Sequence, residues 1–116
     1  MDATNAIART LRVVVELLVR HDYGGLERMT GGERLRASEM EAAIRDYGRT
    51  LVMPLAEDFL RADVIPVQES SPPAYSVRFR IYTEEEGLSD LELQATLVGD
   101  PDAETLSVEL DNIIVA

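Results

Sequence analysis

Hydrophobic residues in the first part of the chain recur with the period of an α-helix. Between residues 3 and 21 the apolar positions are spaced by four, three and four, at Ile7, Leu11, Val14 and Leu18. This spacing places them along one side of a helix. We expect Asp2 or Thr4 to cap the start of that helix and Gly24-Gly25 to end it.

A second helix is predicted after a short turn-like piece, Leu26 to Met29. The segment Ser38-Glu39-Met40-Glu41 has the form of a capping box, in which each outer side chain satisfies a backbone N–H of the other residue. The helix should end at Gly48, because glycine readily adopts the left-handed conformation. Its buried face should consist of Met40, Ala43, Ile44 and Tyr47.

Prolines mark the next elements. Pro54 suits the first turn of a third, short helix that runs to Leu60, in which Leu55 and Phe59 lie one turn apart. The segment Val64-Ile65-Pro66-Val67 reads as an edge strand, because proline cannot donate to a ladder on both sides.

The pattern then changes to strict alternation over three segments. The residues of one face are Tyr75, Val77, Phe79 and Ile81, then Leu91, Leu93, Ala95 and Leu97, then Leu106, Val108 and Leu110. Such alternation is typical of strands with one buried face. The links, Thr83 to Asp90 and Gly99 to Glu104, are short enough to make consecutive strands antiparallel neighbours.

These elements together indicate an α+β fold in a single domain, residues 1–116. The N-terminal helices should pack on one face of a three- to four-stranded antiparallel meander sheet. On the other face, matching the apolar positions puts Arg80 opposite Glu92. Glu92, Glu109 and Asp111 should crowd that outer face, where like charges cost stability.

The charge is distributed very unevenly along the sequence. There are 22 acidic and 11 basic residues, the basic residues are all arginines, and the net charge is -11. Ten of the acids and none of the arginines follow Arg80. Such a field attracts cationic surfaces and speeds their encounter. The acids expected to contact a partner are Glu84, Glu85, Glu86, Asp90, Glu92, Glu109 and Asp111.

The composition argues against most catalytic and metal chemistry. The chain has no cysteine and one histidine, His21, so neither a thiolate nucleophile nor a histidine-rich metal site can be assembled. We expect no enzyme activity, cofactor or metal. The runs Glu84-Glu85-Glu86 and Asp100 to Glu104 are interpreted as solvated hairpin tips, with binding of a divalent cation as the alternative. We also expect no nucleic-acid partner, because acids are interleaved with the arginines.

No targeting or membrane segment is apparent in the sequence. The chain has no apolar run of about 20 residues, the length that a membrane span needs, and its first residues are acidic and polar rather than basic and apolar. We therefore expect a cytoplasmic protein.

Several phrases of the sequence resemble those of small uncharacterised bacterial domains. They are Ile44 to Leu51, Ser71 to Val77, Glu84 to Leu91 and Asp111 to Val115. Some of these domains are similar to immunity proteins of toxin systems. The resemblance implies the same layout of helices followed by a meander, and it assigns no catalytic or binding residue.

The leading functional hypothesis is a non-enzymatic acidic protein-binding module. It would be an immunity-type or antitoxin-type protein that neutralises a basic partner. A homodimer of this chain is compatible with that function. The alternative is a cystatin-like or NTF2-like cup that binds a small apolar ligand or acts as a small enzyme. A deep pocket with converging polar groups would favour the cup, and a filled core with an acidic sheet face would favour the binding module.

Overall fold

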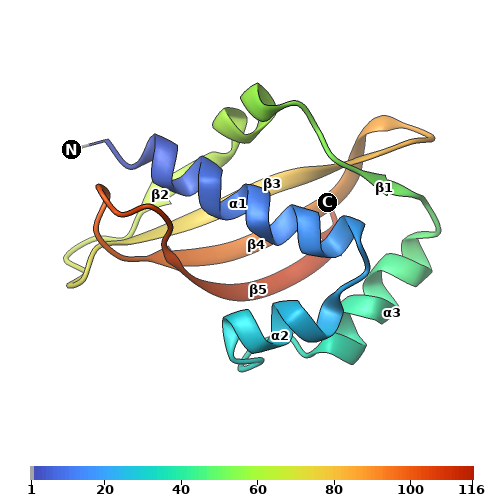
Figure 1. Ribbon diagram of the computed structural model, residues 1–116, viewed down its shortest axis with the longest axis horizontal. Helices are drawn as coiled ribbons and strands as arrows, with labels where there is room; N and C mark the ends of the chain where they lie inside the picture. The colour runs from blue at the N-terminus through green and yellow to red at the C-terminus, as the bar shows by residue number, and fades with distance from the viewer. Residues whose placement is uncertain (1) are drawn as a thin grey trace.

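The molecule is built on one curled antiparallel sheet (Figure 1). The computed structural model describes residues 2–116. The elements in chain order are α1 (Thr4–Val19), α2 (Tyr23–Thr30), α3 (Ala37–Tyr47), β1 (Leu51–Val52), the 3₁₀ helix η1 (Ala56–Arg61), β2 (Asp63–Pro66), β3 (Ala74–Thr83), β4 (Gly87–Val98) and β5 (Ser107–Val115). The strand order is β1-β3-β4-β5, and β2 pairs with the same edge of β3 as β1 does. The expected α+β fold is therefore confirmed.

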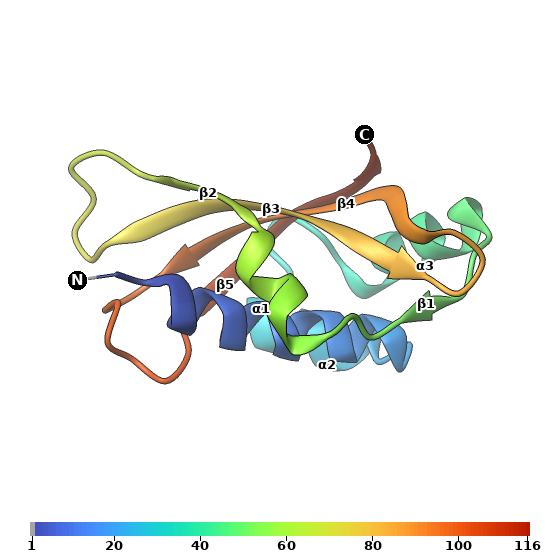
Figure 2. The ribbon, with the colours of Figure 1, turned by 90° about the horizontal axis from the view of Figure 1, so that it is seen from above.

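Helix α1 lies across one face of the sheet and forms the centre of the core (Figure 2). Its Leu11, Val14, Val15 and Leu18 are completely buried. Side chains of this size each contribute about 1.5–3 kcal/mol when removed from water. They meet the predicted apolar faces of β3 and β4, including Leu93 and Leu97. The inner face of the sheet is thus filled by side chains.

The prediction that Gly24-Gly25 ends the first helix was wrong, because both glycines lie inside α2. Helix α1 ends at Val19, and His21 adopts the left-handed conformation with φ 59°. Asp22 then caps α2 by accepting the N–H of Gly25 at 2.9 Å. A Cβ at Gly25 would lie 2.6 Å from the Asp22 carboxylate, so the glycine permits this close cap. The expected turn from Leu26 to Met29 is accordingly helical.

The third helix of the chain, α3, begins one residue before Ser38, so the predicted capping box is displaced. Glu39 is the capping acid, since its Oε1 accepts the N–H of Arg36 at 3.0 Å. Met40 and Ile44 form the buried face as predicted. Gly48 ends the helix with φ 71°, which confirms its left-handed role.

The short helix after Pro54 is a 3₁₀ helix, and only half of its predicted buried pair is buried. Phe59 lies in the core, where it stacks on Phe79 with ring centroids 5.3 Å apart. Leu55 precedes the helix and is 67% exposed. Pro54 lies before the helix rather than in its first turn. Asp58 fixes the start of η1 by accepting the N–H of Leu55 at 2.9 Å.

Strands β3, β4 and β5 confirm the three alternating segments, with two irregularities. Strand β4 begins at Gly87, so the first connection is shorter than the predicted Thr83 to Asp90. Its residues Ser89 to Leu91 all lie opposite Ile81, which makes a bulge. A second bulge in β5 leaves Asp111 as an extra residue between two paired ones. Both bulges position acidic side chains of the outer face.

Candidate partner-binding face

The outer face of the sheet is the face directed away from α1. Its side chains are Ser76, Arg78, Arg80 and Tyr82 of β3, Leu88, Asp90, Glu92, Gln94 and Thr96 of β4, and Glu109, Asp111, Asn112 and Ile114 of β5. In Figure 2, α1, α2 and η1 all lie on the opposite side of the sheet. Within residues 2–116, helices α2 and α3 contact the edge strand β5 rather than covering this outer face.

Arg80 occupies the predicted register position but pairs with a different acid. Its Cα lies opposite Glu92, as expected. Its Nη2, however, lies 3.0 Å from Asp90 Oδ1, and its Nε donates to the carbonyl of Ser89 at 2.8 Å. The β4 bulge causes this exchange, because the additional residues bring Asp90 beside the guanidinium. The expected Arg80–Glu92 ion pair is therefore replaced by Arg80–Asp90.

The β4 bulge is held from inside the core by Ser89. Its hydroxyl donates to the carbonyl of Ile81 at 2.6 Å and accepts the N–H of Leu91 at 3.1 Å. The side chain is 1% exposed. A buried polar group of this kind positions the backbone that carries Asp90 on the other side of the sheet.

Glu109 and Asp111 were expected to repel each other without compensation, and this prediction was wrong. Arg34, in the connection from α2 to α3, places its Nε 3.4 Å from Glu109 and 3.2 Å from Asp111. Thr96 also donates its hydroxyl to Asp111 Oδ2 at 2.8 Å. Because the Arg34 side chain is 60% exposed, each ion pair contributes less than about 1 kcal/mol.

Glu92 differs from the other carboxylates of the outer face. It accepts a hydrogen bond from Gln94 Nε2 at 2.7 Å. Among the described residues, no arginine lies within ion-pair distance of it, whereas Asp90, Glu109 and Asp111 each have one. Glu92 is also at the centre of the sheet, between β3 and β5. Among the four carboxylates Asp90, Glu92, Glu109 and Asp111, Glu92 is thus the one without a direct ion pair within residues 2–116.

The run Glu84-Glu85-Glu86 forms the turn between β3 and β4, and two of its carboxylates are bound by the rest of the molecule. Glu85 accepts the N–H of Thr50 at 2.8 Å and the Thr50 hydroxyl at 3.0 Å. The amide hydrogen bond from Thr50 is the main cause that lowers the pKa of Glu85 below its usual value. The Glu85 side chain is exposed, as expected of a solvated tip, and its carboxylate is in addition bound by the backbone N–H and the hydroxyl of Thr50.

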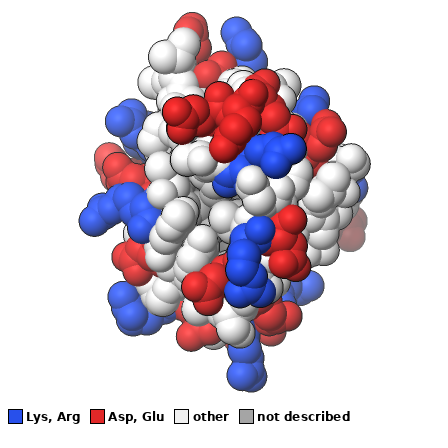
Figure 3. Space-filling view, turned by 90° about the vertical axis from the view of Figure 1, so that its right-hand side faces the viewer, with Lys and Arg blue, Asp and Glu red and all other residues white. Residues whose placement is uncertain are grey.

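Glu86 is bound in the same turn by two hydroxyl groups. Tyr47 donates to its Oε1 at 2.8 Å, and Thr83 donates to the same oxygen at 3.1 Å. Tyr47 belongs to α3, so the turn is tied to a helix 39 residues earlier in the chain. Figure 3 shows this end of the molecule, where acidic side chains gather with arginines beside them. No sequence motif predicts these contacts, because they join segments far apart in the chain.

The residues with catalytic or metal-binding chemistry are scattered. Within residues 2–116, no three His, Cys, Asp or Glu side chains come together as a set of metal ligands. His21 stacks on Tyr23 with ring centroids 5.8 Å apart. Burial, aided by the charge of Glu41, raises the pKa of Tyr23 above its usual value.

Comparison with known proteins identifies a family. A domain of unknown function, DUF7668, matches residues 15–116. The chain belongs to this family. No curated protein and no solved structure matches it. The DUF7668 match includes the last turn of α1 and every strand, so the outer face lies within the family domain. None of the helices in the described part of the chain is long and apolar enough to cross a membrane.

Proposed function

We propose that this DUF7668 protein is a non-enzymatic binding module that docks a basic protein partner on the outer face of its sheet. The observation that carries the proposal is the carboxylate of Glu92, which has no direct ion pair within residues 2–116 and lies at the centre of an uncovered face. Asp90, Glu109 and Asp111 lie on the same face, where Arg80 and Arg34 pair with them and Arg78 lines a hollow together with Glu92. The finer proposal is that the partner is a toxin and that the module is of the immunity or antitoxin type.

The packing of the inner face supports a binding module over an enclosed cup. Because α1 covers the inner side of the sheet, the outer face is the face of the sheet left for a partner. Edge strand β5 is flanked by α2 and α3, which protects it from adding a further strand. Docking by side chains on the face is therefore favoured over pairing at this edge.

A partner with clustered arginines or lysines would be attracted over a long range by the net charge of -11. Contact would then replace the repulsion among the outer-face carboxylates by ion pairs. This mechanism predicts rapid association at low salt that slows steeply as ionic strength rises, because salt screens the long-range attraction.

The decisive experiment compares two charge reversals that change the net charge equally. Glu92→Lys reverses the proposed contact, and Glu16→Lys reverses an exposed carboxylate on α1. The partner to test first is the protein encoded by the neighbouring gene, mixed with each variant in stopped-flow measurements at several salt concentrations. We expect Glu92→Lys to slow association by about tenfold or more and Glu16→Lys by about twofold.

Equal effects of the two reversals would reject the outer face as the contact. An association rate that is indifferent to salt would reject the electrostatic mechanism. Analytical ultracentrifugation of the protein without a partner tests whether a second copy of the chain occupies the outer face. That occupant would be identified if the protein is a dimer and Glu92→Lys dissociates it.

A further inference from the structure

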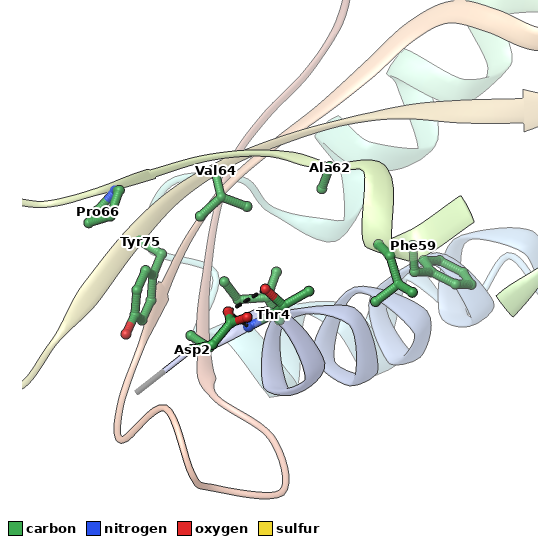
Figure 4. Close-up of a pocket in the computed structure, with 10 residues that line it drawn as sticks. Asp2, Thr4, Phe59, Ala62, Val64, Pro66 and Tyr75 are labelled. Atoms are coloured by element: carbon green, nitrogen blue, oxygen red, sulfur yellow. Dashed lines mark hydrogen bonds between the residues drawn. The ribbon is translucent and has the colours of Figure 1, made fainter. Parts of the chain in front are cut away.

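A second candidate site lies on the opposite side of the molecule from the outer face. It is a pocket of about 390 Å³ between the start of α1, helix η1 and the paired strands β2 and β3 (Figure 4). This volume falls within the range of small-molecule sites, about 300–1,000 Å³. The residues that line it and bear on a ligand are Asp2, Thr4, Leu60, Val64 and Tyr75.

The walls of the pocket combine apolar and polar groups and come mainly from α1, η1, β2 and β3. In Figure 4, Ala62, Val64 and Pro66 form one side, and Phe59 and Tyr75 lie toward opposite ends. Phe59 is buried and stacked on Phe79, so its position is fixed by the core. Leu60 and Val64 are exposed at 51% and 37%. They leave an apolar surface that a hydrophobic ligand would remove from water.

The polar groups gather on the side formed by the start of α1. Asp2 is the one charged residue that lines the pocket. Its Oδ1 accepts both the N–H and the hydroxyl of Thr4, whereas its Oδ2 has no partner among the described residues. These two hydrogen bonds, the hydroxyl bond first, lower the pKa of Asp2 below its usual value, so the group is ionised at neutral pH.

The charge of Asp2 selects the kind of ligand. An anion would normally favour the start of a helix, but the N–H of Thr4 is already taken by the Asp2 carboxylate. A cation would find the Oδ2 atom, which has no hydrogen-bond partner within residues 2–116, and the face of the Tyr75 ring, both of which attract positive charge. A ligand with an apolar body would meanwhile cover the exposed side chains of Leu60 and Val64.

We propose that this pocket binds a small amphipathic amine, whose ammonium group contacts Asp2 and whose hydrocarbon body lies between α1 and β2. The proposal is independent of the protein partner on the outer face. The pocket lies beside α1 on the inner side of the sheet, so ligand and protein partner would bind on different sides.

Three probes of nearly equal size separate charge from hydrophobicity: 2-phenylethylamine, 2-phenylethanol and phenylacetate. Each is titrated into the ¹⁵N-labelled protein, and backbone amide shifts are followed by NMR. We expect the amine to shift the amides of Thr4, Val64 and Tyr75 and to bind about fivefold more tightly than the alcohol, the upper range for an exposed ion pair. Phenylacetate should leave these amides unchanged.

Two variants and a matched control test whether the probes bind in this pocket. Asp2→Asn should bring the affinities for amine and alcohol together. Val64→Phe should fill the pocket and weaken both probes by about tenfold. Ile65→Phe is the control, because Ile65 is the next residue of β2, is 67% exposed and does not line this pocket.

The outcomes divide clearly. The proposal is overturned if none of the probes shifts the pocket amides at about 10 mM, a concentration that reveals even millimolar affinity. Equal affinity for all three probes would overturn the preference for an amine. Equal losses in Val64→Phe and Ile65→Phe would show that the probes bind elsewhere.

Discussion

Two acid-rich regions of this chain look alike in sequence and differ in the folded molecule. The first is the β3–β4 turn, Glu84-Glu85-Glu86, and the second is the outer face with Asp90, Glu92, Glu109 and Asp111. In the turn, the carboxylates of Glu85 and Glu86 accept hydrogen bonds from Thr50, Tyr47 and Thr83. These contacts hold the end of α3 and the start of β1 against the sheet.

On the outer face the acids accept fewer such bonds, the exception being Asp111, whose Oδ2 accepts the hydroxyl of Thr96. Arg80 and Arg34 pair with three of them through exposed contacts, and the Glu92 carboxylate accepts a hydrogen bond from Gln94. Exposed ion pairs contribute little stability, so these side chains are available to a partner. The comparison teaches that a carboxylate bound to backbone N–H groups supports the fold, whereas one held only by an exposed arginine can be exchanged.

The largest effect should come from Ser89, which supports the outer face from within the core. Ser89→Ala removes the hydroxyl that bonds Ile81 and Leu91, and it leaves a buried carbonyl and N–H without that partner. We expect a loss of about 1–3 kcal/mol in the free energy of unfolding, measured by urea denaturation. The NMR signals of Asp90 should also shift. A loss below about 0.5 kcal/mol would show that the bulge does not depend on this hydroxyl.

A smaller effect is expected in the turn, where Glu85 and Glu84 make a matched pair. Glu85→Ala should lower the melting temperature, because Thr50 N–H and hydroxyl lose their acceptor. Glu84→Ala should leave it nearly unchanged, since the Glu84 side chain has no hydrogen bond or ion pair within residues 2–116. Glu85→Gln should fall between them, because its amide keeps one acceptor oxygen. Equal melting temperatures for the two alanine variants would show that the hydrogen bonds of Glu85 do not stabilise the fold.

The pH dependence of the melting temperature tests whether the ionised carboxylate of Glu85 causes this stabilisation. The folded state lowers the pKa of Glu85 below its usual value of 4.5, so Glu85 stabilises the fold above that pH. This contribution is lost as the pH falls below 4.5 and through the lower folded-state pKa. The difference in melting temperature between parent and Glu85→Ala should therefore shrink in acid. A difference that stays constant down to pH 3 would contradict the role of the ionised group.

The alternation of hydrophobic residues was sufficient to predict the sheet and the inner face. Val77, Phe79 and Leu93 all point to the core because a strand has a period of two. The two-residue strand β1 is too short to produce such a pattern, and it exists because β3 offers Tyr82 and Thr83 as pairing partners. Gly24-Gly25 was misread for a related reason, since Asp22 and tertiary packing override the low helix propensity of glycine.

The candidate site was predictable only in part. Register alone placed Arg80 opposite Glu92 and put Glu92, Glu109 and Asp111 on the outer face. The ion pairs depend on two bulges and on Arg34, which is more than 70 residues from Glu109 in the chain. Local patterns carry no information about such distant contacts. The uneven distribution of charge along the sequence is consequently reduced in the folded molecule, because arginines from the first 80 residues lie beside the acidic strands.

The smallest effect on stability should come from Glu92, and it sharpens the comparison with Glu85. Glu92→Gln keeps an acceptor for Gln94 and removes one charge from a face that also carries Asp90 and Glu109. We expect the free energy of unfolding to change by at most about 0.5 kcal/mol, with any change being a gain, because repulsion is relieved. Urea denaturation at low and high salt measures it, and the gain should vanish at high salt because the repulsion is screened. A loss above about 1 kcal/mol would mean that Glu92, like Glu85, is retained for the fold rather than for a partner.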